Sequence, residues 1–329
     1  MSNRSRRLPA VDAHYDGIIL RQIRGDAMDL TSPDAVYHAD LPRLRKGNFG
    51  ALFVMVGDNH LVPSLRMIDA VRSMCEQRPK DYALCLNGAD VRRAMRTGRL
   101  GLVMTIEGQV MFEESVELLR NWHRLGVRVA SLTHGEGRFG GSRYALQADR
   151  SAFGYVTPAE RDLIRRQTKG ITPYARRALD LMAELNMPCD VSHTNDPAFW
   201  ETLEYARGPL CYTHGNCYSL CPHARNLTDE MMKALAERGG VMALSFYRMF
   251  ISQKEATLDR LVEHFLHALE IMGPDHVGLG SDYDGLPADQ CPLLEAESLG
   301  SLWDALARRG VSSATLRKIA SENHIRLLS

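Results

Sequence analysis

Residues 8–13 read Leu-Pro-Ala-Val-Asp-Ala, and His14-Tyr15-Asp16 follows them directly. The first part is short and mostly apolar, a pattern typical of a strand buried in a sheet. Side chains two positions apart lie on the same face of a strand, so His14 and Asp16 can both reach one cation. The stretch therefore predicts a buried strand that ends in two metal ligands.

Seven further short apolar stretches follow, most of them separated by helical patterns. They cover residues 51–56, 102–106, 127–133, 187–192, 210–213, 241–246 and 276–281. Continuous apolar runs are typical of strands buried on both faces, as in parallel sheets. Strands that alternate with helices in this way predict an α/β fold, a (β/α)₈ TIM-like barrel. The length of 329 residues suits one large domain or two smaller ones, and we expect one barrel over residues 1–329.

Two of the connecting helices can be delimited from the sequence. One carries an apolar stripe at helical spacing and should end at Gly126, a common helix stop. Thr228 is the expected N-cap of the other, and Gly239 follows its last turn. The stripe of the first helix consists of Phe112, Val116, Leu119, Trp122 and Leu125.

Most of the predicted strands end in, or lead directly into, a residue type that binds metals. In barrels of this kind the chemistry lies at the C-terminal ends of the strands. A single mouth would therefore receive side chains from most of the ring. These residues are His14, Asp16, Glu107, His134, His193, His214 and Asp282.

Five of these residues form a candidate metal-binding set, comprising His14, Asp16, Glu107, His193 and His214. A set of this size, with a carboxylate able to bridge, predicts two ions roughly 3.5–4 Å apart, as in two-metal hydrolases. A water held between the ions would lose a proton near neutral pH and act as the nucleophile. Histidine and carboxylate ligands accept Zn²⁺, and also Mn, Co or Fe.

Each candidate also has a simpler structural explanation. A single histidine at a strand end is more often hydrogen-bonded within the protein than a ligand. Glu107 before Gly108 could cap a helix, Asp282 could belong to a turn, and Arg225 could anchor a loop. Their joint placement at one barrel face favours the functional interpretation.

Charge and composition exclude several classes of function. Lys plus Arg and Asp plus Glu number 40 each, which indicates neither nucleic-acid binding nor an acidic membrane surface. The N-terminal residues lack the apolar segment of a signal peptide, and no segment is long enough to span a bilayer. Seven cysteines without a framework spacing indicate reduced thiols. We therefore expect a cytoplasmic protein without nucleic-acid or membrane partners.

Several other features are expected to be structural. Residues 1–7 read as a flexible basic tail, and 135–170 as a long loop after the fourth strand, either a substrate-selecting loop or a disordered insertion. His264 and His267 are expected on a solvated helix face, and Cys189 and Cys211 should pack as small hydrophobic groups.

Five segments resemble, in order along the chain, the signature of the membrane (renal) dipeptidase family, the M19 metallopeptidases. The clearest is CYTHGNCYSLCPHARNLTD at 211–229. The others are DAHYD at 12–16, TIEG at 105–108, DVSH at 190–193 and GSDYDG at 280–285. The resemblance implies a metal-dependent amidohydrolase barrel, commonly dimeric. Such enzymes carry two Zn²⁺ and cleave dipeptides, often with a D-residue at the C-terminal position.

The resemblance also implies roles for individual residues. His14 and Asp16 would bind the first zinc, His193 and His214 the second, and Glu107 both. His134 would contact the scissile carbonyl or oxyanion, and Asp282 would carry the proton and help to hold the substrate amine. Arg225 would bind the substrate's C-terminal carboxylate, for which its planar fork is suited. Asn226, next to Arg225, and Tyr247, at the end of the seventh strand, are further candidate substrate-binding residues.

The chain departs from the family pattern after His134, in the run GEGRFGGSRY, and at Ser245, where relatives often carry Asn. Both changes are expected on the substrate side of the site. They leave open a second enzyme hypothesis, a same-fold amidohydrolase acting on a modified dipeptide, an N-acyl amino acid or a lactam. A barrel that binds a ligand without turnover is the non-enzymatic alternative, and the intact ligand set argues against it.

Overall fold

The computed structural model describes residues 8–31, 36–57, 60–108, 112, 115–135, 137–142, 154–285, 293 and 295–329. Its strands are all parallel and form one sheet in the order β2-β1-β9-β8-β7-β6-β5-β4-β3. An additional pairing of β2 with β4 closes the sheet into an eight-stranded barrel. The strands are β1 (Ala10–Tyr15), β2 (Phe49–Met55), β3 (Tyr82–Leu84), β4 (Leu100–Ile106), β5 (Val127–Ser131), β6 (Cys189–Asp190), β7 (Leu210–Gly215), β8 (Val241–Leu244) and β9 (Val277–Leu279).

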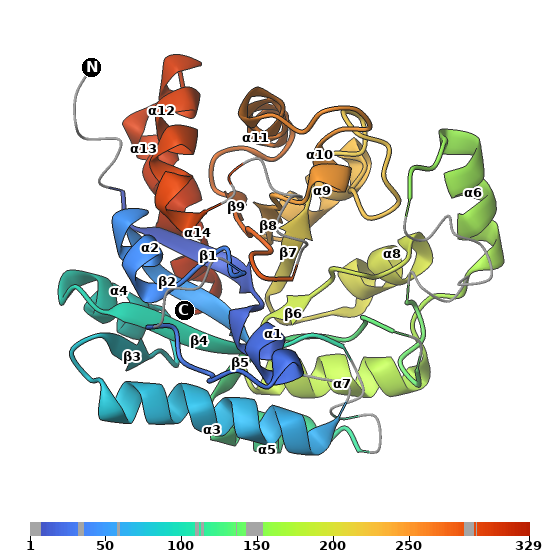
Figure 1. The fold of residues 1–329 in the computed structure, drawn as a ribbon. Helices are drawn as coiled ribbons and strands as arrows, with labels where there is room; N and C mark the ends of the chain where they lie inside the picture. The colour runs from blue at the N-terminus through green and yellow to red at the C-terminus, as the bar shows by residue number, and fades with distance from the viewer. Residues whose placement is uncertain are drawn as a thin grey trace.

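Helices surround the barrel and connect most of its strands (Figure 1). This arrangement confirms the predicted (β/α)₈ class. The helices are α1 (Gly17–Arg24), α2 (Leu41–Lys46), α3 (Leu61–Gln77), α4 (Gly88–Arg96), α5 (Leu118–Leu125), α6 (Pro158–Gln167), α7 (Pro173–Glu184), α8 (Asp196–Tyr205), α9 (Asp229–Glu237), α10 (Arg248–Ile251), α11 (Leu258–Met272), α12 (Gly300–Arg308), α13 (Ser313–Arg317) and α14 (Asn323–Leu327).

The strand β3 was not expected from the sequence. It has three residues, and it pairs Tyr82 with Leu100 and Leu84 with Leu102 at the start of β4. A run this short gives no apolar signal of its own, and only Tyr82 among its residues is buried. The pairing with β4 therefore decides its conformation. Each of the eight predicted strands overlaps an observed strand, with ends shifted by at most two residues.

The predicted helix ends agree with the structure, and one predicted start does not. Gly126 ends α5 with φ of 113°, and the Thr228 hydroxyl accepts the backbone N–H of Met231 at the start of α9. However, α5 begins only at Leu118, so Phe112 of the predicted stripe precedes the helix while still being buried. The apolar stripe in the sequence is longer than the helix because a residue can be buried without being helical.

The long segment 135–170 is partly helical. It contains α6, which begins with a capping box in which the side chains of Thr157 and Glu160 each accept the other's backbone N–H. The prediction of a continuous loop was therefore wrong for this part. Residues 136 and 143–153, like the tail 1–7, lie outside the described residues. Within the described part of the chain, the structure contains no helix with the length and apolarity needed to cross a bilayer.

Alternate strand residues fill the inside of the barrel. Val11, Phe53 and Val103 pack there with Ile325 and Leu328 from the C-terminal end of the chain. His324 of α14 lies against Gly278, where a side chain larger than hydrogen would collide with the imidazole. The C-terminal segment therefore closes one end of the barrel. Functional side chains have space at the opposite end, where the strands terminate.

Candidate metal centre and active site

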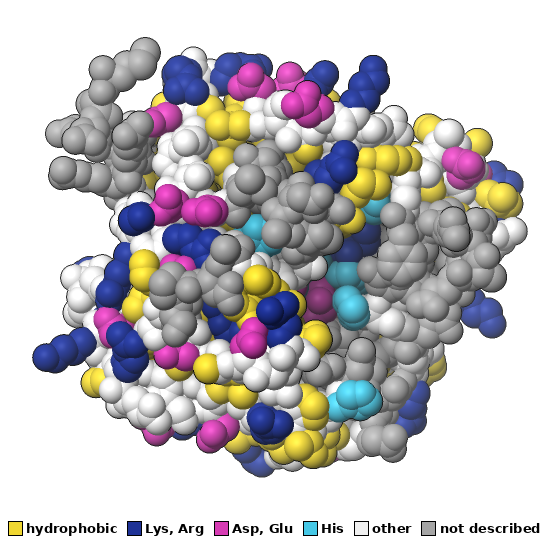
Figure 2. Space-filling model, in the orientation of Figure 1, with side chains coloured by type: hydrophobic (Ala, Val, Ile, Leu, Met, Phe, Trp, Pro, Cys, Tyr) yellow, Lys and Arg dark blue, Asp and Glu magenta, His cyan; other side chains and the backbone are white. Residues whose placement is uncertain are grey.

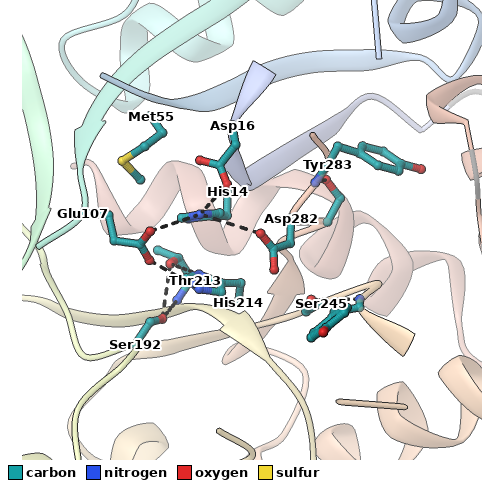
Figure 3. A network of polar contacts seen from close by, with 12 residues as sticks. His14, Asp16, Met55, Glu107, Ser192, Thr213, His214, Ser245, Asp282 and Tyr283 are labelled. Atoms are coloured by element: carbon teal, nitrogen blue, oxygen red, sulfur yellow. Dashed lines mark hydrogen bonds and ion pairs between the residues drawn. The ribbon is translucent and has the colours of Figure 1, made fainter. Parts of the chain in front are cut away.

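The structure brings the predicted ligand and acid–base residues together at the C-terminal mouth of the barrel. Figure 3 shows His14, Asp16, Glu107, His214 and Asp282 among them. His14 lies in β1, Glu107 directly follows β4, and His214 lies in β7. His134, His193 and Asp282 each come three residues after the end of a strand, namely β5, β6 and β9. In Figure 2, histidine and acidic side chains lie side by side in a hollow of the surface.

Glu107 occupies the middle of this group. Its Oε1 lies 2.9 Å from His193 Nε2 and 3.4 Å from His214 Nε2. Its Oε2 lies 3.9 Å from His14 Nε2 and 3.8 Å from His134 Nε2. One carboxylate oxygen thus faces the pair His193 and His214, and the other faces His14 and His134, which is the arrangement a bridging ligand requires.

The donor set fits two divalent cations. Oε1 of Glu107 is buried, and it lies close to the Nε2 atoms of His193 and His214, which are only 2.9 Å apart. A cation among these three atoms would be a partner for each of them. His14 Nε2 lies 3.5 Å from Asp16 Oδ2 and 3.9 Å from Asp282 Oδ1, so nitrogen and oxygen donors converge on one point. Zinc and similar ions accept such a mixture of imidazole and carboxylate.

A hydrogen bond at Nδ1 orients the His214 ring so that its other nitrogen, Nε2, faces Glu107. Its Nδ1 lies 2.9 Å from the Thr213 hydroxyl oxygen, and that hydroxyl donates to Asp190 Oδ2 at 2.6 Å. The hydroxyl oxygen therefore accepts a hydrogen bond from Nδ1–H, which leaves the lone pair of Nε2 for a cation. Asp190 is buried and also accepts the backbone N–H groups of Ser192 and Thr213.

His193 makes a different contact. Its Nδ1 lies 2.9 Å from Arg225 Nη1, and a guanidinium can only donate. A neutral ring in this arrangement carries its proton on Nε2, the nitrogen that faces Glu107. Ligation of a cation by Nε2 therefore requires Arg225 to release His193.

Burial and neighbouring charges shift the pKa values of these groups. Burial raises the pKa of Asp282 to about 7, an effect that His14 opposes and the Asp16 and Glu107 carboxylates reinforce. Burial also acts to raise the pKa of Glu107, but the imidazoles of His193 and His134 outweigh it and hold this pKa well below its usual range. A bound cation would add its own positive charge to this balance.

The remaining predicted substrate-binding residues divide into two kinds. Arg225 is buried, and its Nη2 donates to the backbone oxygen of His214 at 3.3 Å, which places the guanidinium beside the candidate metal ligands. Tyr247 is half-buried, and burial together with the nearby charge of Asp282 raises its pKa. Both side chains are thus close to the candidate centre.

Asn226 does not contribute its side chain to the site. Its amide nitrogen donates to the backbone oxygens of Cys221 and Phe250, and its amide oxygen accepts the Asn216 N–H. These contacts use the whole amide within the loop after β7. The predicted substrate contact of Asn226 is therefore replaced by a structural role.

Ser245 likewise does not face a substrate. It is fully buried, and its hydroxyl accepts the backbone N–H of Tyr247 at 3.1 Å, while its own N–H and C=O pair with the Asn216 amide. The departure from the family pattern at this position therefore concerns the packing behind the site.

The prediction for His264 was wrong. It is buried, its Nδ1 accepts the backbone N–H of Cys217 at 3.1 Å, and its Nε2 lies 3.0 Å from the backbone oxygen of Ile251. Burial lowers its pKa to about 4, so the ring is neutral near pH 7. Its partner in the helical pattern, His267, is partly exposed and lies 2.9 Å from Asp229. Cys189 and Cys211 are buried free thiols, as predicted.

Sequence reasoning missed an ion pair behind the site. Arg161 of α6 donates to both carboxylate oxygens of Asp196, at 2.7 and 2.9 Å, and to the backbone oxygen of Asn226 at 2.9 Å. All three residues are buried. A single Arg in a charged helix and a single Asp after Asn195 carry no signal in the sequence, because the pairing joins residues 35 positions apart.

A parallel barrel with imidazole and carboxylate groups gathered at its mouth defines a candidate metalloenzyme of the TIM-barrel class. The chain belongs to the membrane dipeptidase family, peptidase family M19, whose model matches residues 3–329.

Similar proteins include two dipeptidases. Dipeptidase tcpJ of Claviceps purpurea is 28% identical over 90% of this chain and 69% of its own length. Dipeptidase ataJ of Aspergillus terreus is 29% identical over 98% and 84%. Among solved structures, a metallo peptidase from Rhodobacter sphaeroides, liganded with a phosphinate mimic of the dipeptide L-Ala-D-Ala, superposes with a TM-score of 0.83 at 23% identity. The superposition covers 98% of this chain and 99% of that one.

Proposed function

We propose that this protein is a zinc-dependent dipeptidase with two Zn²⁺ per chain, able to accept a D-residue at the C-terminal position of the substrate. The observation that carries the proposal is Glu107, whose two oxygens each face a different pair of imidazoles. Membership of the membrane dipeptidase family supports the reaction class. The relative that binds a mimic of L-Ala-D-Ala supports the stereochemistry.

The metal-binding residues of the proposal are His14, Asp16, Glu107, His193 and His214. When bound, two divalent ions supply an activated water and polarise the scissile carbonyl. Mn, Co or Fe would suit the same ligands. The chain's contribution is to fix the geometry, through the bridging position of Glu107 and the Asp190–Thr213 support behind His214.

The other residues act on the substrate. His134 is about half-exposed and stands over Glu107, where it can donate to the oxygen of the carbonyl under attack. Asp282 lies beside His14 and can take up a proton and pass it to the leaving amine. Arg225, once it has released His193, can bind the substrate carboxylate with its planar fork.

A dipeptide panel with L- and D-residues at the second position tests the proposal. Hydrolysis should occur with zinc-loaded protein, stop on chelation and return on addition of zinc. The order of the substrates would reveal the preferred chirality. Two ions per chain with no hydrolysis across the panel would contradict dipeptidase activity and shift attention to N-acyl amino acids and lactams.

We also propose that the chain forms a homodimer, as its resemblance to the family implies. Light scattering after size-exclusion chromatography tests this directly. A mass of twice 36.8 kDa is expected, and a single-chain mass would contradict it.

A further inference from the structure

A cleft of about 240 Å³ opens beside the candidate metal centre. Its lining includes the carboxylates of Asp16 and Glu107, both proposed metal ligands, and His134, whose Nε2 lies 3.8 Å from Glu107. One wall is aliphatic, and it consists of Ile19, Leu20 and Ile23 from α1 with Met55 at the end of β2. We refer to these four residues as the α1 wall.

The α1 wall results from the two-sided character of α1. Residues three and four apart share a helix face, so Ile19, Leu20 and Ile23 form one apolar surface. Ile18 and Arg21 lie on the opposite side and are buried against the barrel. Ile23 is 70% exposed and Ile19 and Leu20 are half-buried, which leaves apolar area that a ligand can cover.

The position of the α1 wall relative to Arg225 indicates which part of a bound dipeptide would contact the wall. Arg225 is held by His193 and by the backbone of His214, which belong to the β6 and β7 side of the barrel. In the closed strand order, β6 and β7 lie across the ring from β1 and β2, which carry the α1 wall. Arg225 is not among the described residues that line the cleft. A dipeptide with its carboxylate on Arg225 and its amide at Glu107 therefore extends its N-terminal residue toward the α1 wall.

We propose that the site selects dipeptides with an aliphatic N-terminal side chain, which packs on Ile19, Leu20, Ile23 and Met55. This inference rests on the proposed dipeptidase function and adds the substrate class. Packing removes apolar surface of both partners from water and favours longer aliphatic groups.

The same cleft disfavours an acidic N-terminal side chain. None of the described residues that line it is Lys or Arg. A carboxylate packed against the aliphatic α1 wall would lose water without gaining a cationic side chain as partner, so desolvation disfavours it.

The experiment compares kcat/KM of the zinc-loaded full chain for Leu-Ala, Gly-Ala and Glu-Ala. Leu-Ala should exceed Gly-Ala by at least about tenfold, the lower end of what an apolar contact contributes to discrimination. Glu-Ala should be the poorest of the three. In the double variant Ile19→Ala/Ile23→Ala the Leu-Ala to Gly-Ala ratio should fall to within about threefold. The charge-introducing variant Ile23→Lys should raise Glu-Ala relative to Leu-Ala.

The control is Leu163→Ala, which truncates a 54% exposed aliphatic side chain on α6. It should keep the wild-type ratio. Calorimetric binding of phosphinate dipeptide analogues, with leucine-like or glycine-like first side chains, gives a readout independent of turnover and should show the same preference.

The outcomes separate the two proposals. Absence of hydrolysis for every dipeptide would contradict the proposed function. Hydrolysis with a Leu-Ala to Gly-Ala ratio near one, or with a ratio that survives in the double variant, would overturn the α1 wall as a specificity surface while leaving the dipeptidase function in place.

Discussion

The two sides of the active-site mouth are built differently. On the β6 and β7 side, polar groups are buried and paired: Arg225 with His193, Arg161 with Asp196, and Asn226 with three backbone groups. On the β1 and β2 side, α1 leaves aliphatic side chains partly exposed in an open cleft. The candidate metal centre lies between the two sides.

The difference corresponds to what each side would bind. Every dipeptide has the same carboxylate at its C-terminus, and the planar Arg225 guanidinium, which also donates to the backbone oxygen of His214, offers this group a directed pair of donors. The N-terminal side chain varies, and apolar contact tolerates variation because it has no direction. In this comparison the β6 and β7 side is the anchoring side, which would bind the carboxylate. The β1 and β2 side is the selecting side, which would contact the variable N-terminal side chain.

The largest effect is expected where the two sides meet. Asp282→Asn should keep both ions bound and lower kcat by about 10²–10⁴, the usual contribution of a positioned acid–base group. Asp282 has φ of 66°, which Asn tolerates well, so the backbone should not change. Metal analysis and steady-state kinetics test this together, and wild-type turnover would show that Asp282 carries no proton.

Breaking the ion pair behind the anchoring side should cost stability. Arg161→Met leaves Asp196 as a buried, unpaired carboxylate and should lower the free energy of unfolding by about 3–5 kcal/mol. Denaturant titration measures the change. Arg165→Met on the same helix removes an exposed pair with Asp162 and should change stability by less than about 1 kcal/mol. Equal effects of the two changes on the free energy of unfolding would contradict a stabilising role of the buried Arg161–Asp196 pair.

A conservative change at the anchor should affect only substrates with a free carboxylate. Arg225→Lys loses the planar fork, and kcat/KM for Leu-Ala should fall by about 10- to 100-fold, mainly through KM. Hydrolysis of Leu-Ala amide, which offers no carboxylate, should fall much less. Parallel losses for both substrates would place the carboxylate elsewhere.

A smaller effect is expected from His264, which supports the loop that carries Arg225. Its folded-state pKa of about 4 lies below the usual value of 6.5, so the folded protein holds it neutral. Its contribution to stability is present above pH 6.5 and is lost as the pH falls toward 4. Between pH 7 and pH 5 the loss should be about 2 kcal/mol. His264→Gln should make the pH dependence of unfolding shallower by this amount, and an unchanged slope would contradict it.

The candidate metal-binding side chains and most of the barrel strands could be located from the sequence because their signals are local. Buried parallel strands are continuous apolar runs, and their ends were marked by His14, Glu107 and His214. The short strand β3 and the helix α6 were not predicted. The first depends on pairing with β4, and the second lies in a segment whose polar composition resembles a loop.

The other incorrect predictions concern side chains whose roles depend on residues far away in the sequence. Asn226 was expected to touch substrate, but its amide is used by backbone groups of Asn216, Cys221 and Phe250. His264 was expected in solvent, and the packing of α11 buries it against the β7 loop. Neither partner is visible from the residues next to these positions.

The sequence by itself determined the barrel class and the set of candidate metal-binding residues, because hydrophobic runs and ligand chemistry are properties of short segments. Only the tertiary structure decided that Glu107 lies between two imidazole pairs. It also decided that Arg161 donates a hydrogen bond to the loop that carries Arg225, and that aliphatic side chains of α1 line the cleft. These features depend on the closure of the sheet, which joins residues far apart in the chain and fixes which sides of the mouth oppose each other.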